Sequence, residues 1–178
     1  MLLLKVVLSL IKKEEVIIGI DAGTTRVGYS ILSIYKGKSK NLSQNSKIKL
    51  ISFGLLNITE TEHHLRLKQI YKEFIKLLKK YKPKKVIIER LYFNLNAKTA
   101  MEVSQAVGVI TLACVLNNVF VDYLTPTQVK SIITSNGKAT KQDIAQKIKQ
   151  FFNIQEKLID DITDAIAISL AFVIKEYT

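Results

Sequence analysis

A short apolar stretch that ends on a carboxylate constrains this chain more than any other feature. Residues 16–20 are Val-Ile-Ile-Gly-Ile, a pattern typical of a strand buried on both faces. Asp21 closes the run, and a turn rich in small residues leads into a second apolar stretch at residues 29–34. An acid at the end of a buried strand is costly unless it binds something. Asp21 therefore predicts a metal ion or a phosphate-bearing ligand, and the glycines beside it predict room for close approach.

The order of the expected elements indicates an α/β domain with a mixed sheet. Strands are expected at residues 16–21, 29–34, 50–58, 86–89 and 120–124, the first three as an antiparallel meander with a polar loop at 36–49. Helices are expected at residues 62–81, 97–117, 126–134 and 140–152, and from 156 or 157 to 177. A chain of 178 residues is long enough for one domain with its own core. We expect residues 16–178 to form that domain.

Residues 1–15 are expected to be an N-terminal extension. Their apolar part is interrupted by Lys5 and is too short to cross a bilayer, so no membrane partner is expected. The single cysteine, Cys114, cannot form an internal disulfide and indicates a reducing compartment. We expect a cytoplasmic, nucleoid-associated protein, while organellar targeting by the extension stays open.

The charge balance favours a polyanionic partner. The chain has 27 Lys and Arg against 15 Asp and Glu, a formal net charge of +12. Nucleic acid is the simplest partner for such an excess. Solvated lysine faces explain the same composition, so charge alone does not choose between the two.

Acidic residues recur at three widely separated places where elements begin or end. Asp21 and Glu89 each end a short apolar strand, and Asp160, Asp161 and Asp164 lie near the start of the last helix. Both Asp160 and Asp161 can share a helix face with Asp164, so spacing leaves the choice between them open. Carboxylate oxygens are the ligands that hard divalent cations prefer, and two such cations catalyse phosphodiester hydrolysis.

Each acidic position also has a structural alternative. Asp21 can cap its own turn, and Glu89 can pair with Arg90, Arg26 or a lysine. The acids at 160–164 can complement the dipole of a helix N-terminus. Two strand-end acids and a helix pair in one chain are harder to explain by structure alone.

Four sequence blocks resemble the RuvC family of Holliday-junction resolvases in order and spacing. They are residues 18–29, 87–100, 125–130 and 161–168, and the similarity runs from about residue 16 to the C-terminus. The resemblance implies a ribonuclease-H-like fold with a five-stranded mixed central sheet flanked by α-helices. It implies a crossover junction endodeoxyribonuclease that cleaves four-way DNA junctions in recombination and repair. It also implies two Mg²⁺ ions per active site, with Mn²⁺ as a substitute.

The same resemblance assigns residues to the chemistry. Asp21, Glu89, Asp161 and Asp164 match the catalytic, metal-binding carboxylates of the family, which resolves the choice toward Asp161. With these partners in place, the glycine-rich turn after Asp21 is expected to leave room for a DNA backbone beside the cations.

DNA contacts are implied as well. Lys130 and Lys141 match basic positions that contact DNA, and Lys138 in the turn between them is a further candidate. Tyr92 stands where the family has an aromatic residue that stacks at the opened junction, and the adjacent Phe93 competes for that role.

The resemblance also implies partners. The helix at 97–117 is similar to the dimer-forming helix of the family, and its small residues fit a close helix–helix approach. A homodimer on four-way junction DNA is expected, with a branch-migration complex of the RuvA–RuvB type as the further partner.

Other function classes fit the sequence less well. The run Asp-Ala-Gly-Thr-Thr also opens the phosphate loop of actin-like sugar kinases and ATPases, but those proteins need two such domains and this chain is too short. A non-catalytic junction-binding module is disfavoured by the complete set of carboxylates. The alternative that remains is another ribonuclease-H-like nuclease, acting on RNA or on other branched nucleic acid.

Overall fold

The structure is a computed structural model that describes residues 14–35, 47–90 and 97–177, and it contains one five-stranded sheet. The strands lie in the order β3-β2-β1-β4-β5. They are β1 (Glu14–Ala22), β2 (Val27–Tyr35), β3 (Lys47–Leu55), β4 (Lys85–Glu89) and β5 (Phe120–Leu124). Strands β1, β2 and β3 form an antiparallel meander, whereas β4 and β5 run parallel to β1. The mixed α/β sheet predicted from the sequence is confirmed.

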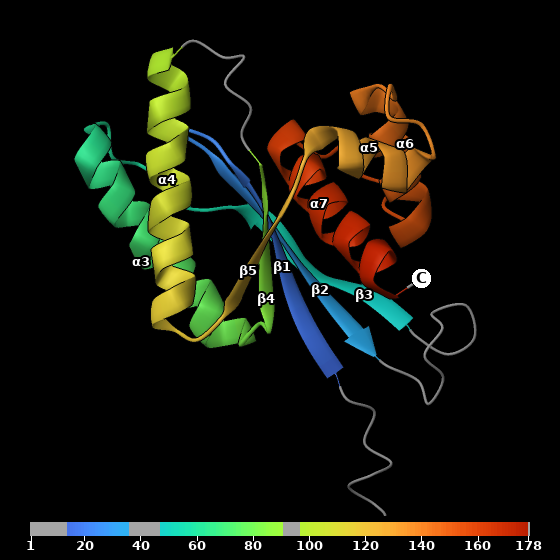
Figure 1. The fold of residues 1–178 in the computed structure, drawn as a ribbon, viewed down its shortest axis with the longest axis horizontal. Helices are drawn as coiled ribbons and strands as arrows, with labels where there is room; N and C mark the ends of the chain where they lie inside the picture. The colour runs from blue at the N-terminus through green and yellow to red at the C-terminus, as the bar shows by residue number, and fades with distance from the viewer. Residues whose placement is uncertain (1–13, 36–46, 91–96, 178) are drawn as a thin grey trace, which may run out of the picture.

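Helices cover both faces of this sheet. Helices α3 (His63–Tyr81) and α4 (Ala97–Leu116) lie on one face. Helices α5 (Pro126–Thr134), α6 (Lys141–Phe152) and α7 (Asp160–Tyr177) lie on the other (Figure 1). Each face therefore has its own apolar core, and both cores share the central strand β1.

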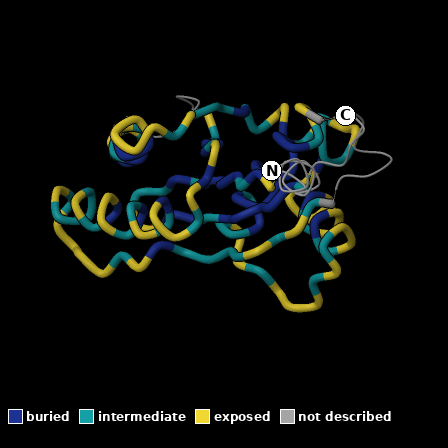
Figure 2. The backbone as a smooth tube through the Cα atoms, turned by 90° about the horizontal axis from the view of Figure 1, so that it is seen from below, coloured by how far each residue is buried: buried dark blue, intermediate teal, exposed yellow. Residues whose placement is uncertain are grey.

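Strand β1 is buried on both sides, as its unbroken apolar run requires. Ile18 and Ile20 pack with Phe74 in the core beneath α3 and α4. Ile17 points the other way and packs with Phe172 beneath α7. Figure 2 shows the buried backbone in the middle of the molecule with exposed turns around it. The buried part of β1 ends at its C-terminal residues, next to Asp21.

Several predicted boundaries were wrong by a few residues. Strand β3 spans Lys47–Leu55 rather than 50–58, so residues 47–49 of the predicted polar loop belong to the sheet. The edge strand tolerates polar residues there, and the ammonium group of Lys49 packs over the Tyr35 ring. Helix α7 begins at Asp160 rather than at 156 or 157, because its hydrogen bonds start at the carbonyl of Ile159.

Strand β1 starts two residues before the predicted domain boundary. Glu14 pairs with Tyr35 across to β2. Glu15 is buried, and its Oε1 lies 3.0 Å from the Nζ of Lys84. The fold thus takes in the last two residues of the predicted extension, and residues 1–13 lie outside the described part of the chain.

Helix α4 has an unusual distribution of apolar side chains. Its mean hydropathy over Thr99–Leu116 is 1.6, and of the helices in the described part of the chain it alone is long and apolar enough to cross a membrane. It packs on α3 and on strands β1 and β5. Ala100, Ala106 and Ala113 are buried within the chain, so these small residues serve close packing inside the domain.

Candidate active site

Two carboxylates lie side by side at one edge of the sheet. In the parallel pairing of β1 with β4, Ile20 is opposite Ile88. Asp21 and Glu89 each follow directly, so both strands deliver an acid at the same end. Leu124 of β5 pairs with Glu89, which brings the start of α5 to this edge too. The sheet order thus converts two distant sequence positions into neighbours.

Helix α7 reaches this edge because glycines let it lie almost on the sheet. A Cβ atom on Gly28 would lie 2.1 Å from the carbonyl oxygen of Asp161, and one on Gly19 would lie 2.3 Å from that of Ala165. The Ser30 hydroxyl donates to the same Ala165 oxygen at 2.8 Å. This close contact holds the first two turns of α7 over the end of β1.

Two glycines near Asp21 are required by contacts within the chain. Gly28 makes room for α7. Gly23 closes the turn itself, since its N–H donates to the Arg26 carbonyl at 2.9 Å and an added Cβ would lie 2.6 Å from that oxygen. The expectation that this turn leaves space for a DNA backbone beside the cations stays a prediction.

The four predicted catalytic acids share one electrostatic environment. Burial, followed by the charges of Glu89, Asp164 and Asp161, raises the pKa of Asp21 to about 7. The pKa of Glu89 is raised by burial and then by Asp164, and burial is also the main cause of the raised pKa of Asp164. Each raised pKa reports a carboxylate that is costly to ionise without a cation nearby.

Two basic side chains partly neutralise the acids of α7. The Nζ of Lys141 lies 3.1 Å from Oδ2 of Asp164 and 3.9 Å from Oδ2 of Asp160. The Nε of Arg26 lies 3.3 Å from Oδ2 of Asp161. Burial acts to lower the pKa of Lys141, but the charge of Asp164 and its hydrogen bond outweigh this and raise it. Arg26 therefore pairs with Asp161 and not with Glu89, and no ion pair to Glu89 occurs within the described residues.

Asp160 and Asp161 differ in exposure and in the direction they face. The side chain of Asp160 is 80% exposed, whereas that of Asp161 is 20% exposed. The charge of Asp161 contributes to the raised pKa of Asp21. Asp161 is thus the residue that faces the strand-end acids, and Asp160 lies at the rim.

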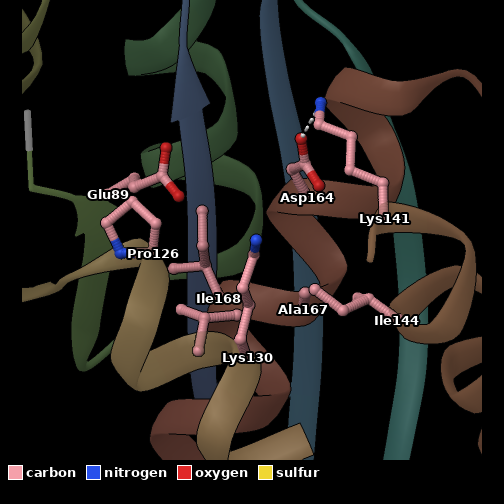
Figure 3. Close-up of a pocket in the computed structure, with 9 residues that line it drawn as sticks. Glu89, Pro126, Lys130, Lys141, Ile144, Asp164, Ala167 and Ile168 are labelled. Atoms are coloured by element: carbon pink, nitrogen blue, oxygen red, sulfur yellow. Dashed lines mark hydrogen bonds and ion pairs between the residues drawn. The ribbon is translucent and has the colours of Figure 1, made fainter. Parts of the chain in front are cut away.

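A pocket of about 240 Å³ opens between these acids and helices α5 and α6. Glu89 and Asp164 line it on two sides, and Lys130 and Lys141 are also among its lining residues (Figure 3). The charge of Lys130 acts to lower the pKa of Glu89, so the two groups interact across the pocket. A phosphodiester backbone, with metal ions at the acids and lysines beside its phosphates, would fit this distribution of charge.

Capping boxes fix the starts of the two helices that carry Lys130 and Lys141 to the pocket. Thr125 forms a capping box with Gln128 at the start of α5, and Thr140 forms one with Asp143 at the start of α6. Lys130 lies in the second turn of α5, and Lys141 is the first residue of α6.

The remaining predicted DNA contacts lie elsewhere. Lys138 is exposed in the turn between α5 and α6, outside the lining of the pocket. Tyr92 and Phe93 lie outside the described residues.

The donor set fits a hard divalent cation. All four acids offer oxygen ligands, and Oδ2 of Asp161 is buried and accepts no hydrogen bond in the described part of the chain, although it forms the ion pair with Arg26. Within that part, no three acidic, histidine or cysteine side chains already form a metal-binding group. With Lys141 and Arg26 bound to the acids of α7, a cation would have to displace these pairs by side-chain rotation.

Comparison with known proteins places these features in a family. Residues 17–172 match the family described as "Crossover junction endodeoxyribonuclease RuvC". A protein of that name from Brachyspira hyodysenteriae is 40% identical over 155 residues, covering 86% of this chain and 91% of that protein. Another from Fusobacterium nucleatum is 39% identical over 159 residues, covering 88% of this chain and 79% of that protein.

Solved structures show the same fold. The structure of Thermus thermophilus RuvC matches with a TM-score of 0.77 at 25% identity, over 89% of this chain and 93% of that one. The yeast mitochondrial Holliday junction resolvase Ydc2 matches with a TM-score of 0.66 at 18% identity, over 98% of this chain and 84% of that one. The ribonuclease-H-like architecture expected from the sequence is confirmed.

Proposed function

The chain belongs to the RuvC family of crossover junction endodeoxyribonucleases, and we propose that Asp21, Glu89, Asp161 and Asp164 form its metal-dependent active site. The function that follows is resolution of Holliday junctions by paired hydrolysis of phosphodiester bonds. One observation carries the residue assignment. Acids from β1, β4 and α7 converge at one end of the sheet, where burial and mutual repulsion raise the pKa of Asp21 to about 7.

The proposed cofactor is Mg²⁺, with two ions per site and Mn²⁺ as an alternative. When bound, such ions activate a water molecule and stabilise the leaving oxygen of the cleaved phosphodiester. Asp21 interacts with all three other acids and is thus suited to a central ligand position. Glu89 and Asp164 line the pocket from two sides, which suits them to hold ions on either side of a phosphate.

The lysines of the pocket act on the DNA in this proposal. Lys130 and Lys141 place ammonium groups beside the acids, where they can contact the phosphates next to the cleaved bond. Lys138, exposed in the turn between α5 and α6 and outside the pocket lining, is a more distant candidate for contact with the same DNA strand. The stacking role of Tyr92 or Phe93 stays a prediction.

A homodimer is the proposed active form. Met101, Leu112, Val115 and Leu116 of α4 are between 55% and 64% exposed. Leu112, Val115 and Leu116 follow the i, i+3, i+4 spacing of one helix face. We propose that a second copy covers this face, which would place two active sites on two junction strands. Association with a branch-migration complex of the RuvA–RuvB type and a cytoplasmic location stay predictions.

The experiment that tests this function compares three substrates. Purified protein is incubated with a synthetic four-way junction, a linear duplex of the same sequence and an RNA–DNA hybrid, each with and without Mg²⁺. We expect paired nicks on the junction alone, and only with Mg²⁺. Preferential cleavage of the hybrid would instead favour a ribonuclease-H-like enzyme acting on RNA.

A further inference from the structure

A second pocket lies beside the active site, between the β1–β2 turn and the loop that precedes α7. It has a volume of about 410 Å³ and is lined by Arg26, Lys157, Leu158, Ile159 and Asp160. We call it the Arg26 pocket. None of the residues assigned to the active site lines it, although Asp160 at the start of α7 does and Arg26 forms an ion pair with Asp161.

The Arg26 pocket continues into a basic strip. An adjoining pocket of about 160 Å³ shares Lys157, Leu158 and Asp160 with it, and its other charged lining residues are Lys141, Lys149 and Asp164. Basic side chains therefore extend from Arg26, across the N-terminal end of α7, to the lysine that binds Asp164. Such a strip is suited to follow a polyanionic backbone away from the active site.

The two basic side chains of the Arg26 pocket are both exposed, but only Arg26 forms an ion pair within the described residues. The side chain of Arg26 is 60% exposed and has one anionic partner among the described residues, Oδ2 of Asp161 at 3.3 Å. Lys157 is exposed and has no ion pair within that same part of the chain.

We propose that the Arg26 pocket binds a backbone phosphate of the junction strand that is being cut, through Arg26 and Lys157. This proposal rests on the proposed function, because the ligand is a neighbouring phosphate of the same substrate. A guanidinium group offers five donors in a planar fork that matches phosphate oxygens. Leu158 and Ile159 supply an apolar surface against which the attached sugar can pack.

Metal binding controls this pocket. Without a metal ion, the negative charges of Asp160 and Asp161 balance the positive charges of Arg26 and Lys157. A cation that engages Asp161 displaces Arg26 from its carboxylate and leaves the pocket with net positive charge. Divalent cation and DNA phosphate therefore strengthen each other's binding, and by linkage the effect is reciprocal.

The test measures binding to a four-way junction that carries uncleavable linkages at its centre. Fluorescence anisotropy over a series of salt concentrations, with and without saturating Mg²⁺, gives the affinity and its salt dependence. The variants are Arg26→Gln, Arg26→Lys and Lys157→Gln. The matched control is Lys72→Gln, which removes an exposed lysine of α3 that lies outside both pockets.

With Mg²⁺, we expect Arg26→Gln and Lys157→Gln each to weaken junction binding about 3- to 10-fold and to reduce the salt slope by about one. Arg26→Lys should retain most of the slope, and Lys72→Gln should change neither quantity. Without Mg²⁺, Arg26→Gln should weaken binding by less than about twofold, since Arg26 is then held by Asp161. Calorimetry without DNA should show that Arg26→Gln binds Mg²⁺ more tightly than the wild type, because no side chain competes for Asp161.

Three results would overturn the proposal while leaving the proposed function intact. The first is an unchanged salt slope in both Arg26→Gln and Lys157→Gln when the wild-type protein binds and cuts junctions. The second is an equal loss of affinity in Arg26→Gln with and without Mg²⁺. The third is weaker Mg²⁺ binding in Arg26→Gln, which would make Arg26 a structural support for Asp161. Failure of the wild-type protein to bind or cut junctions would instead remove the proposed function itself.

Discussion

Helices α4 and α7 are both long, apolar and packed on the sheet, yet they differ in what they leave exposed. From Ala165 to Val173, every residue of α7 is buried, and its least buried part near the site is the acidic start, where Asp160 is exposed and Asp161 and Asp164 are partly buried. Helix α4 buries one side, whereas Met101, Leu112 and Val115 on its surface stay open. An apolar helix whose apolar side chains are all buried within the chain leaves only its charged end for a substrate. An apolar helix left half covered indicates a protein partner.

The largest difference in stability between the two helices is expected from glycine substitutions at their packing surfaces. Gly28→Ala would place a Cβ 2.1 Å from a backbone oxygen of α7, so α7 must shift away from β2. We expect a loss of about 3 kcal/mol in unfolding free energy, measured by chemical denaturation. Gly108→Ala on the exposed side of α4 is the control, measured at a concentration at which the protein is monomeric, because a second copy is proposed to cover this side. An added Cβ there has no neighbour within 4 Å, so its higher helix propensity should raise stability by up to about 1 kcal/mol. Equal effects of the two substitutions would contradict the asymmetry.

The exposed face of α4 offers the next test. Leu116→Glu places a charge at a side chain that is 63% exposed, where we expect an interface. The dimer dissociation constant, measured by analytical ultracentrifugation, should rise about 100-fold, in keeping with the roughly 2–4 kcal/mol cost of losing an interface anchor. Phe151→Glu on α6, where the ring is 52% exposed, is the matched control and should leave association unchanged. A monomeric wild-type protein would remove the proposed interface.

A smaller effect on stability is expected from a change of pH, because Asp21 lies among the acids of β4 and α7. The pKa of Asp21 is raised to about 7, so the folded state favours the protonated acid. The stabilisation is complete below about pH 4, the usual pKa of Asp, and is lost as the pH rises through about 7. Without metal, raising the pH from 5 to 8 should lower stability by about 1–4 kcal/mol, and Asp21→Asn should reduce that loss. Thermal unfolding in a chelator measures both. Excess Mg²⁺ should also reduce the loss, and an identical pH dependence in Asp21→Asn would contradict the account.

The residues of the site differ in how far the sequence could predict them. Asp21 and Glu89 were predictable because each ends a short apolar run, and a buried parallel sheet brings such ends together. Spacing alone could not separate Asp160 from Asp161, since both share a helix face with Asp164. The difference depends on where α7 starts and how it sits over Gly28, which only the three-dimensional packing decides.

Arg26 shows a second limit of sequence reasoning. Its place in the β1–β2 turn suggested a partner for Glu89, but the close seating of α7 brings Asp161 nearer. The sequence shows a basic residue two positions before Gly28. Its partner can be identified only when the position of α7, more than a hundred residues further along the chain, is known. The small residues of α4 show the same limit. The sequence does not reveal which of them face α3, and this direction decides whether they pack inside the chain or against a partner.

The most direct test of the central claim compares Asp21→Asn with Asp160→Asn. Junction cleavage with Mg²⁺ is measured together with junction binding and circular dichroism for both variants. We expect Asp21→Asn to lower the cleavage rate by about 1,000-fold or more while it still folds and binds the junction, because it removes the acid that interacts with the three others. Asp160→Asn, at the exposed rim, should stay within about threefold of the wild type. Normal cleavage by Asp21→Asn, or an equal loss in both variants, would contradict the assignment of the active site.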